Sequence, residues 1–115
     1  MSTPNLTQEQ QQEIQKYYQY IQQLESFRMQ IQQLEVEKRE VENAKKEIGS
    51  LDADTTLYRS TGSLLYQTSY DGVQSYLEEQ GEKIEVRLQS VRSREKKLIS
   101  AIEEIQKKLQ GPLGE

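Results

Sequence analysis

Two long segments with a heptad apolar repeat flank a short β-rich centre, and this symmetry limits the possible folds most. The first segment spans about residues 8–48 and the second about residues 70–110. Apolar residues at alternating spacings of three and four predict long helices that pair along one face. Arms of equal length around a compact centre predict that the chain reverses direction there. We therefore expect a mainly α fold, a long antiparallel two-helix coiled coil joined by a single β-hairpin.

The composition argues against an ordinary globular domain. Only 33% of the 115 residues are hydrophobic, while 30% are charged. The mean hydropathy of −0.93 would also suit a disordered chain. The heptad spacing of the apolar residues favours long helices instead.

Several chemistries are excluded because the chain has no cysteine, histidine or tryptophan. Thiol and imidazole catalysis and the usual zinc sites are thereby removed. Asp52 and Asp54 lack further ligands nearby, so we interpret them as turn residues and expect no metal or cofactor. The lack of disulfides favours a cytoplasmic location. No apolar run approaches the ~20 residues of a membrane span, and the first residues do not resemble a signal peptide.

The charge pattern gives no sign of nucleic-acid binding. The net charge is −4, and the basic residues alternate with acidic or polar ones, as in residues 92–97. Nucleic-acid binders usually carry a continuous basic stripe. We interpret the mixed charges as a solvated helix face.

The first helix has a clear start and stop. Thr7 followed by Gln10 matches a capping box, and Gly49-Ser50 is a C-terminal stop signal. Its predicted seam consists of Ile14, Tyr17, Ile21, Leu24, Phe27, Ile31, Leu34, Lys38, Val41, Lys45 and Ile48. Tyr18 and Tyr20 are expected to flank this seam.

The second helix is expected to begin near Ser69 and to end at Gly111-Pro112, which leaves residues 111–115 as a flexible tail. Its predicted seam consists of Leu77, Gly81, Ile84, Leu88, Val91, Glu95, Leu98, Ile102, Ile105 and Leu109. Folding back pairs positions whose numbers sum to about 118 or 119. That register places Lys38 opposite Gly81, Lys45 opposite Gln74, and Glu95 near Arg28. We expect flexing of the coil to start at these two lysine layers.

Residues 51–69 between the arms predict a connection followed by a β-hairpin. Residues 55–59 and 63–68 are rich in β-formers, and Ser60-Thr61-Gly62 between them is a turn signal. Gly62 is expected to adopt a backbone conformation closed to bulkier residues. The predicted oligomerisation residues of this segment are Leu57, Tyr58, Gly62, Leu64, Leu65 and Tyr66. An isolated two-stranded hairpin is marginal in water, so we expect it to associate with hairpins of other chains into a sheet or barrel.

These features together resemble the β-type subunits of prefoldin. The likeness rests on the lead-in of residues 51–54, on Tyr58-Arg59-Ser60-Thr61-Gly62 and on the strand of residues 63–66. In the second arm, residues 84–88 and 94–98 are also similar to archaeal β subunits. Arg59 stands where the family usually has lysine, Thr61 where valine is common, and Gly81 interrupts the second helix.

The resemblance implies a heterohexamer of two α-type and four β-type subunits whose hairpins form a barrel. It also implies capture of unfolded client polypeptides at the coil ends, without ATP or covalent chemistry, and delivery to a group II chaperonin. Unfolded clients, the prefoldin α subunit, further β subunits and the chaperonin are the expected partners, with no nucleic acid or membrane. The predicted client-binding residues are Leu6, Ile14, Tyr17, Ile105, Leu109 and Leu113.

Two other functions fit parts of the pattern. A coiled-coil adaptor that oligomerises through its hairpin would share the fold, and suppression of client aggregation would distinguish the two. An enzyme accessory arm or a nucleic-acid-binding helical hairpin would need a basic face, which the sequence lacks.

Overall fold

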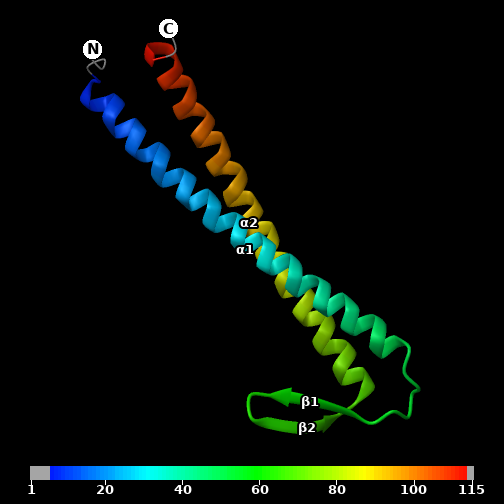
Figure 1. The fold of residues 1–115 in the computed structure, drawn as a ribbon. Coiled ribbons are helices and arrows are strands. Elements are labelled where there is room, and N and C mark those ends of the chain that lie inside the picture. The colour runs from blue at the N-terminus through cyan, green and yellow to red at the C-terminus, as the bar shows by residue number, and fades with distance from the viewer. Residues whose placement is uncertain (1–5, 114–115) are drawn as a thin grey trace. The chain divides into compact units, whose positions relative to one another are not determined.

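The structure, a computed structural model, describes the backbone of residues 6–113 and the side chains of residues 6–110. Helix α1 spans Gln8–Gly49, strand β1 Leu57–Thr61, strand β2 Leu64–Thr68 and helix α2 Tyr70–Leu113 (Figure 1). The two strands form a two-stranded antiparallel sheet. Two long helices joined by one hairpin confirm the predicted fold class. The assembly of hairpins into a barrel stays a prediction.

The chain divides into two compact units. Residues 6–31 and 90–113 form what we call the terminal unit, and residues 32–89, which include the hairpin, form the hairpin unit. Each helix contributes to both units. Within the terminal unit the first turns of α1 lie beside the last turns of α2, as ion pairing between Glu13 and Lys108 at 3.9 Å shows (Figure 1).

The capping box at the start of α1 is confirmed. The backbone N–H of Gln10 donates to Thr7 Oγ1 at 3.0 Å, and the backbone N–H of Thr7 donates to Gln10 Oε1 at 2.8 Å. Each side chain thus satisfies a backbone donor that has no partner within the helix.

Helix α1 ends at Gly49, as predicted, but without a left-handed glycine. Among the described residues, only Gly62 has a positive φ. Instead, the hydroxyl and the backbone N–H of Ser50 both donate to the Glu47 carbonyl, at 2.8 and 3.2 Å. A serine side chain therefore satisfies a carbonyl that a glycine cap would otherwise serve.

Helix α2 starts where the sequence predicts. The Ser69 hydroxyl accepts a hydrogen bond from the Gly72 backbone N–H at 3.0 Å, so Ser69 is the N-cap. The helix continues to Leu113, past the stop that we expected at Gly111-Pro112. A proline in the last turn loses only the one hydrogen bond that its own N–H would have made, so the helix can continue for one residue beyond Pro112.

In the terminal unit the core lies between α1 and α2 around Leu24, Leu98 and Ile102. The partly buried residues packed against these three are Tyr17, Tyr20, Ile21, Phe27 and Ile99. Val91 and Ile105 of α2 are also buried. Tyr20 is partly buried and packs against this core from beside the seam, whereas Tyr18 is exposed.

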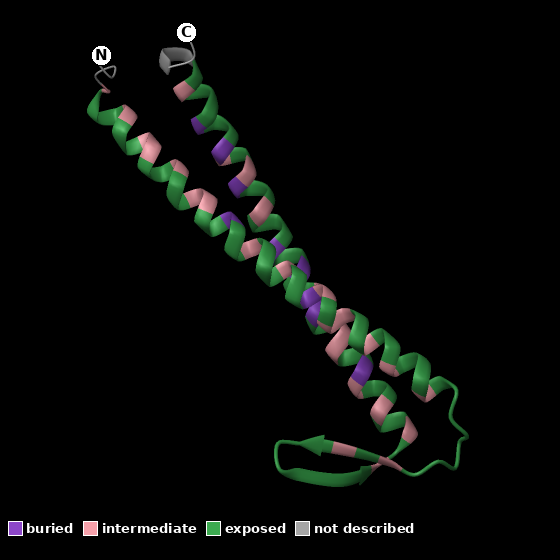
Figure 2. Ribbon diagram, in the orientation of Figure 1, coloured by how far each residue is buried: buried purple, intermediate pink, exposed green. Residues whose placement is uncertain are grey.

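In the hairpin unit the buried residues are Leu34 of α1 and Leu77, Ile84 and Leu88 of α2. In Figure 2 the buried positions follow the helices, while the hairpin is almost entirely exposed. Among the described residues, every buried position of α2 belongs to the predicted seam. The heptad pattern of α2 thus identified its packed face.

The predicted register of the hairpin unit needs a correction. A Cβ placed on Gly81 would lie 3.7 Å from Val41 Cγ1 and 3.8 Å from Lys45 Nζ, so Gly81 does not face Lys38 as expected. Lys38 instead pairs with Glu85 at 3.2 Å. Each seam residue packs between two positions of the partner helix. The register predicted from residue numbers that sum to about 118 or 119 selected the wrong one of these two positions. In the terminal unit, the predicted approach of Arg28 to Glu95 is confirmed, with Nε donating to Oε2 at 3.4 Å.

The hairpin turn is also shorter than predicted and begins two residues later. The strands pair from Leu57 with Thr68 to Thr61 with Leu64, which leaves Gly62-Ser63 as a two-residue loop. Gly62 has a φ of 58°, as expected, and the described residues other than glycine have no positive φ. A single positive φ at the first loop position is typical of a type II′ turn, the geometry that suits the twist of a tight hairpin.

Candidate functional site

The hairpin has two faces with different surroundings. Residues directly opposite in an antiparallel pair point to the same side, and successive residues alternate. The register therefore gives one face, which we call the helix face, consisting of Leu57, Arg59, Thr61, Leu64, Tyr66 and Thr68. The other, which we call the outer face, consists of Tyr58, Ser60, Leu65 and Gln67.

The helix face is partly covered by α2. The guanidinium carbon of Arg59 lies 3.7 Å from the centre of the Tyr76 ring. Leu57, Arg59 and Thr68 are half-buried, while Leu64 and Tyr66, nearer the turn, remain exposed. Coverage by α2 therefore decreases from the base of the hairpin toward its turn.

The outer face has no cover from its own chain. Tyr58 is 60% exposed and Leu65 is 66% exposed. Within the described residues the sheet has two strands, so each strand also presents one unpaired edge. Exposed apolar side chains beside unpaired backbone donors and acceptors are the features of a surface that adds another strand.

The predicted client-binding residues all belong to the terminal unit, but their surroundings differ. Ile105 is buried, and Tyr17 packs against the core while its hydroxyl accepts a hydrogen bond from Gln106 Nε2 at 3.5 Å. Leu6, Ile14 and Leu109 are half-buried. Leu113 lies in the last turn of α2, and its side chain lies outside the described residues.

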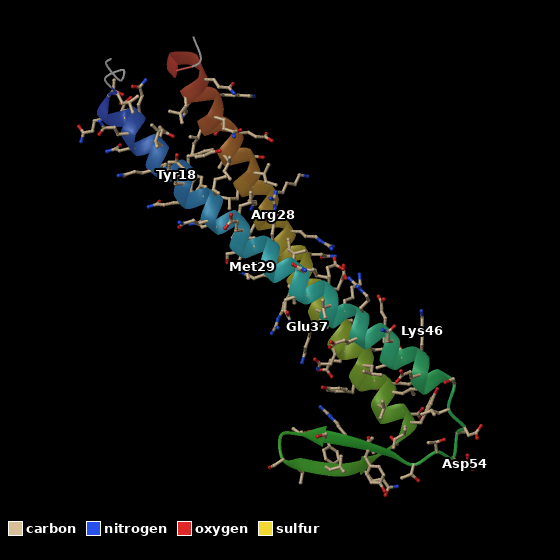
Figure 3. The ribbon with its side chains drawn as sticks, viewed as in Figure 1. Tyr18, Arg28, Met29, Glu37, Lys46 and Asp54 are labelled. Carbon is tan, nitrogen blue, oxygen red and sulfur yellow. The ribbon has the colours of Figure 1, made fainter. Side chains whose placement is uncertain are left out.

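The terminal unit exposes two apolar side chains of α1, Tyr18, which was predicted to flank the seam, and Met29, which was missed from the sequence. Tyr18 is 64% exposed and Met29 is 71% exposed, and both lie on α1 (Figure 3). Met29 follows Tyr18 by eleven residues, which is about three helical turns, so both lie on one face of the helix. This spacing from Tyr18 is the signal that would have identified Met29.

Other kinds of site find no support in the described residues. Across residues 6–113, no three His, Cys, Asp or Glu side chains lie close enough together to hold a metal ion. Neither α1 nor α2, over the same residues, combines the length and the hydropathy that crossing a membrane requires.

These elements define a class of protein: a helical hairpin whose arms pack on each other and whose connecting β-hairpin keeps its apolar side chains exposed. Residues 11–115 match the model of the prefoldin subunit family. The chain belongs to this family, which points to a protein without enzymatic activity.

Similar proteins are β subunits of prefoldin. The chain is 34% identical to prefoldin subunit beta of Methanosarcina barkeri over 71 residues and 36% identical to that of Thermococcus kodakarensis over 70 residues. These segments cover 62% and 61% of this chain and span 61% and 60% of the two relatives.

The solved structures extend the likeness over nearly the whole chain. The prefoldin beta subunit from Thermococcus strain KS-1 superposes with a TM-score of 0.89 at 32% identity, covering 96% of this chain and 97% of that one. The beta2 subunit from the same strain, at 24% identity and a TM-score of 0.71, shares the fold.

Proposed function

We propose that this chain is a subunit of a hetero-oligomeric chaperone that holds unfolded polypeptides without ATP. The observation that carries the proposal is the hairpin, whose apolar side chains are exposed on both faces while the helices bury their own. Membership of the prefoldin family supports the same function. By this likeness the assembly contains two α-type and four β-type subunits, with the hairpins closing into a β-barrel.

Clients would be captured by the terminal unit. Its exposed Tyr18 and Met29, together with half-buried Leu6, Ile14 and Leu109, give a small and adaptable apolar surface. Small flexible surfaces suit weak binding of many partners. A group II chaperonin in the cytoplasm would then receive the client.

The assembly role is tested by Leu65→Asp, mixed with a prefoldin α subunit. A carboxylate on the outer face would have to lose its water on closing the sheet, so hexamers should be lost while helicity stays high. Ser63→Asp, which puts the same charge in the exposed turn, is the control. Light scattering that finds intact hexamers with Leu65→Asp would refute the proposed assembly.

The capture role is tested with the double variant Tyr18→Ser, Met29→Gln in assembled hexamers. We expect weaker suppression of the aggregation of a denatured client, in the absence of nucleotide, because the exposed apolar area of the terminal unit falls. Val86→Gln removes an exposed apolar side chain from the hairpin unit and should have little effect. If wild-type hexamers leave aggregation unchanged, the protein is an adaptor rather than a chaperone.

A further inference from the structure

We propose that Arg59 and Tyr76 form a clamp that fixes the hairpin on α2 and so directs its outer face toward the hairpin of a neighbouring subunit. The inference rests on the proposed function, because it names the surface through which the subunits would meet. Arg59 is a positioning residue in this account, and Tyr58 and Leu65 make the contact.

The first observation is the stacking geometry. The guanidinium carbon of Arg59 lies 3.7 Å from the Tyr76 ring centre, well within the ~6 Å range of cation–π attraction. Arg59 is half-buried, whereas Tyr58 and Ser60 on either side of it are exposed. Tyr66 stands directly opposite Arg59 across the strands, on the same face. The guanidinium therefore lies on an aromatic ring of α2, on the same face of the sheet as Tyr66.

The second observation is how the hairpin joins the helices. Strand β2 is connected to α2 by Ser69 alone, whereas residues 50–56 separate α1 from β1. Ser69 also caps α2, and a Cβ on Gly72 would lie 2.9 Å from Ser69 Oγ and 3.1 Å from Thr68 Oγ1. The base of β2 is thus held tightly against the first turn of α2.

These two attachments act on different strands. Ser69 holds the end of β2, while Arg59 holds the middle of β1. A two-stranded sheet fixed only at the base of one strand could still rotate about that connection, and contact through the other strand opposes the rotation. The clamp therefore determines which face remains open.

A lysine would not replace Arg59 in this role. The guanidinium is planar and weakly hydrated, so it can lie flat on a ring, whereas an ammonium is a compact and strongly hydrated charge. The matched variants are Arg59→Lys, which keeps the charge, Tyr76→Leu, which removes the ring, and Tyr76→Phe, which keeps the ring without its hydroxyl.

The orientation can be measured directly because the chain has no cysteine. Spin labels at Ser63→Cys and Glu82→Cys report the distance from the hairpin turn to α2, both sites being exposed within the hairpin unit. We expect one narrow distance distribution in the parent chain and with Tyr76→Phe. Arg59→Lys and Tyr76→Leu should broaden it.

Assembly provides the second readout. Without the clamp, the midpoint concentration for assembly with a prefoldin α subunit should rise by about two- to fivefold, the factor that a surface cation–π contact supplies. Tyr76→Phe should assemble like the parent. Distances and midpoints unchanged by both Arg59→Lys and Tyr76→Leu would overturn the clamp.

The clamp and the proposed function fail in different ways. If Leu65→Asp abolishes hexamers while both Arg59→Lys and Tyr76→Leu match the parent in distance and midpoint, only the clamp is refuted. If Leu65→Asp assembles normally, the proposed assembly through the outer face is refuted, and the role of the clamp in directing that face is refuted with it.

Discussion

The helical seam and the β-hairpin carry similar apolar side chains but cover them differently. Leu88 in the seam is 0% exposed, while Leu65 in the hairpin is 66% exposed. The helices bury their apolar face within the chain, and the hairpin needs a partner to do so. One leucine therefore contributes to the stability of the subunit and the other is available for association, so the two properties can be altered separately.

The largest expected effect comes from replacing a leucine with alanine, once in the seam and once in the hairpin, and comparing the two losses of stability. Leu88→Ala should lower the free energy of unfolding of the isolated chain by about 2–5 kcal/mol, because it leaves a cavity in a packed layer. Leu65→Ala should change it by less than about 0.5 kcal/mol, because the side chain is already in water.

Urea unfolding followed by circular dichroism measures both values, at concentrations where light scattering finds monomers. Equal losses at the two sites would mean that the hairpin is covered in the isolated chain, and the comparison would no longer hold.

A smaller effect is expected at the start of α1. Thr7→Ala removes the hydroxyl that accepts from the Gln10 N–H, so the free energy of unfolding should fall by about 1 kcal/mol. Thr56→Ala, in the connection before β1, is a control that touches no helix cap. No difference between the two variants in thermal unfolding would show that the first turn is frayed in solution.

Replacing glycine with alanine should have opposite effects on stability in the helical seam and in the hairpin turn. Gly81→Ala should stabilise the chain by about 0.5–1 kcal/mol, because alanine favours a helix and its Cβ would meet neighbours only at ordinary contact distances. Gly62→Ala should instead strain the hairpin turn, where φ is 58°.

Thermal unfolding measures the Gly81 variant, and assembly with the α subunit measures the Gly62 variant. A destabilising Gly81→Ala would show that the register puts a bulkier group at that layer than Val41 and Lys45.

The smallest expected effect concerns the ion pair between Arg28 and Glu95. Arg28 is largely exposed, so Glu95→Gln should cost only about 0.2–1 kcal/mol at low salt. The difference should shrink as salt is added, since the pair is screened. A loss that persists at 1 M salt would indicate a packing role for the Glu95 side chain.

The sequence predicted those parts of the fold that depend on periodicity and on local hydrogen bonding. The heptad repeat identified the buried face of α2, and Thr7-x-x-Gln10 identified the start of α1. Both signals are local or repeated many times, so neighbouring context rarely overrides them. The exposure of the hairpin followed from the lack of any other apolar surface to cover it.

The remaining differences arise where sequence patterns are degenerate. Ser60-Thr61-Gly62 and Gly62-Ser63 both read as turns, and the requirement for a positive φ at the first position of a two-residue loop decided between them. The heptads fixed which faces meet but not the partner of Gly81, because the two helices can shift by about half a repeat and still bury the same seam. The stacking of Arg59 on Tyr76 depends on the angle of the hairpin, which no pattern in the sequence records.

The division of the chain into units also bears on how it forms during synthesis. The hairpin unit is one continuous stretch, residues 32–89, whereas the terminal unit combines residues from both ends of the sequence. A ribosome therefore completes every residue of the hairpin unit before the second half of the terminal unit has been made. We expect nascent chains to fold the hairpin unit, which we propose joins subunits, before the terminal unit, which we propose holds clients, so that pairing between neighbouring nascent chains could begin before clients are bound.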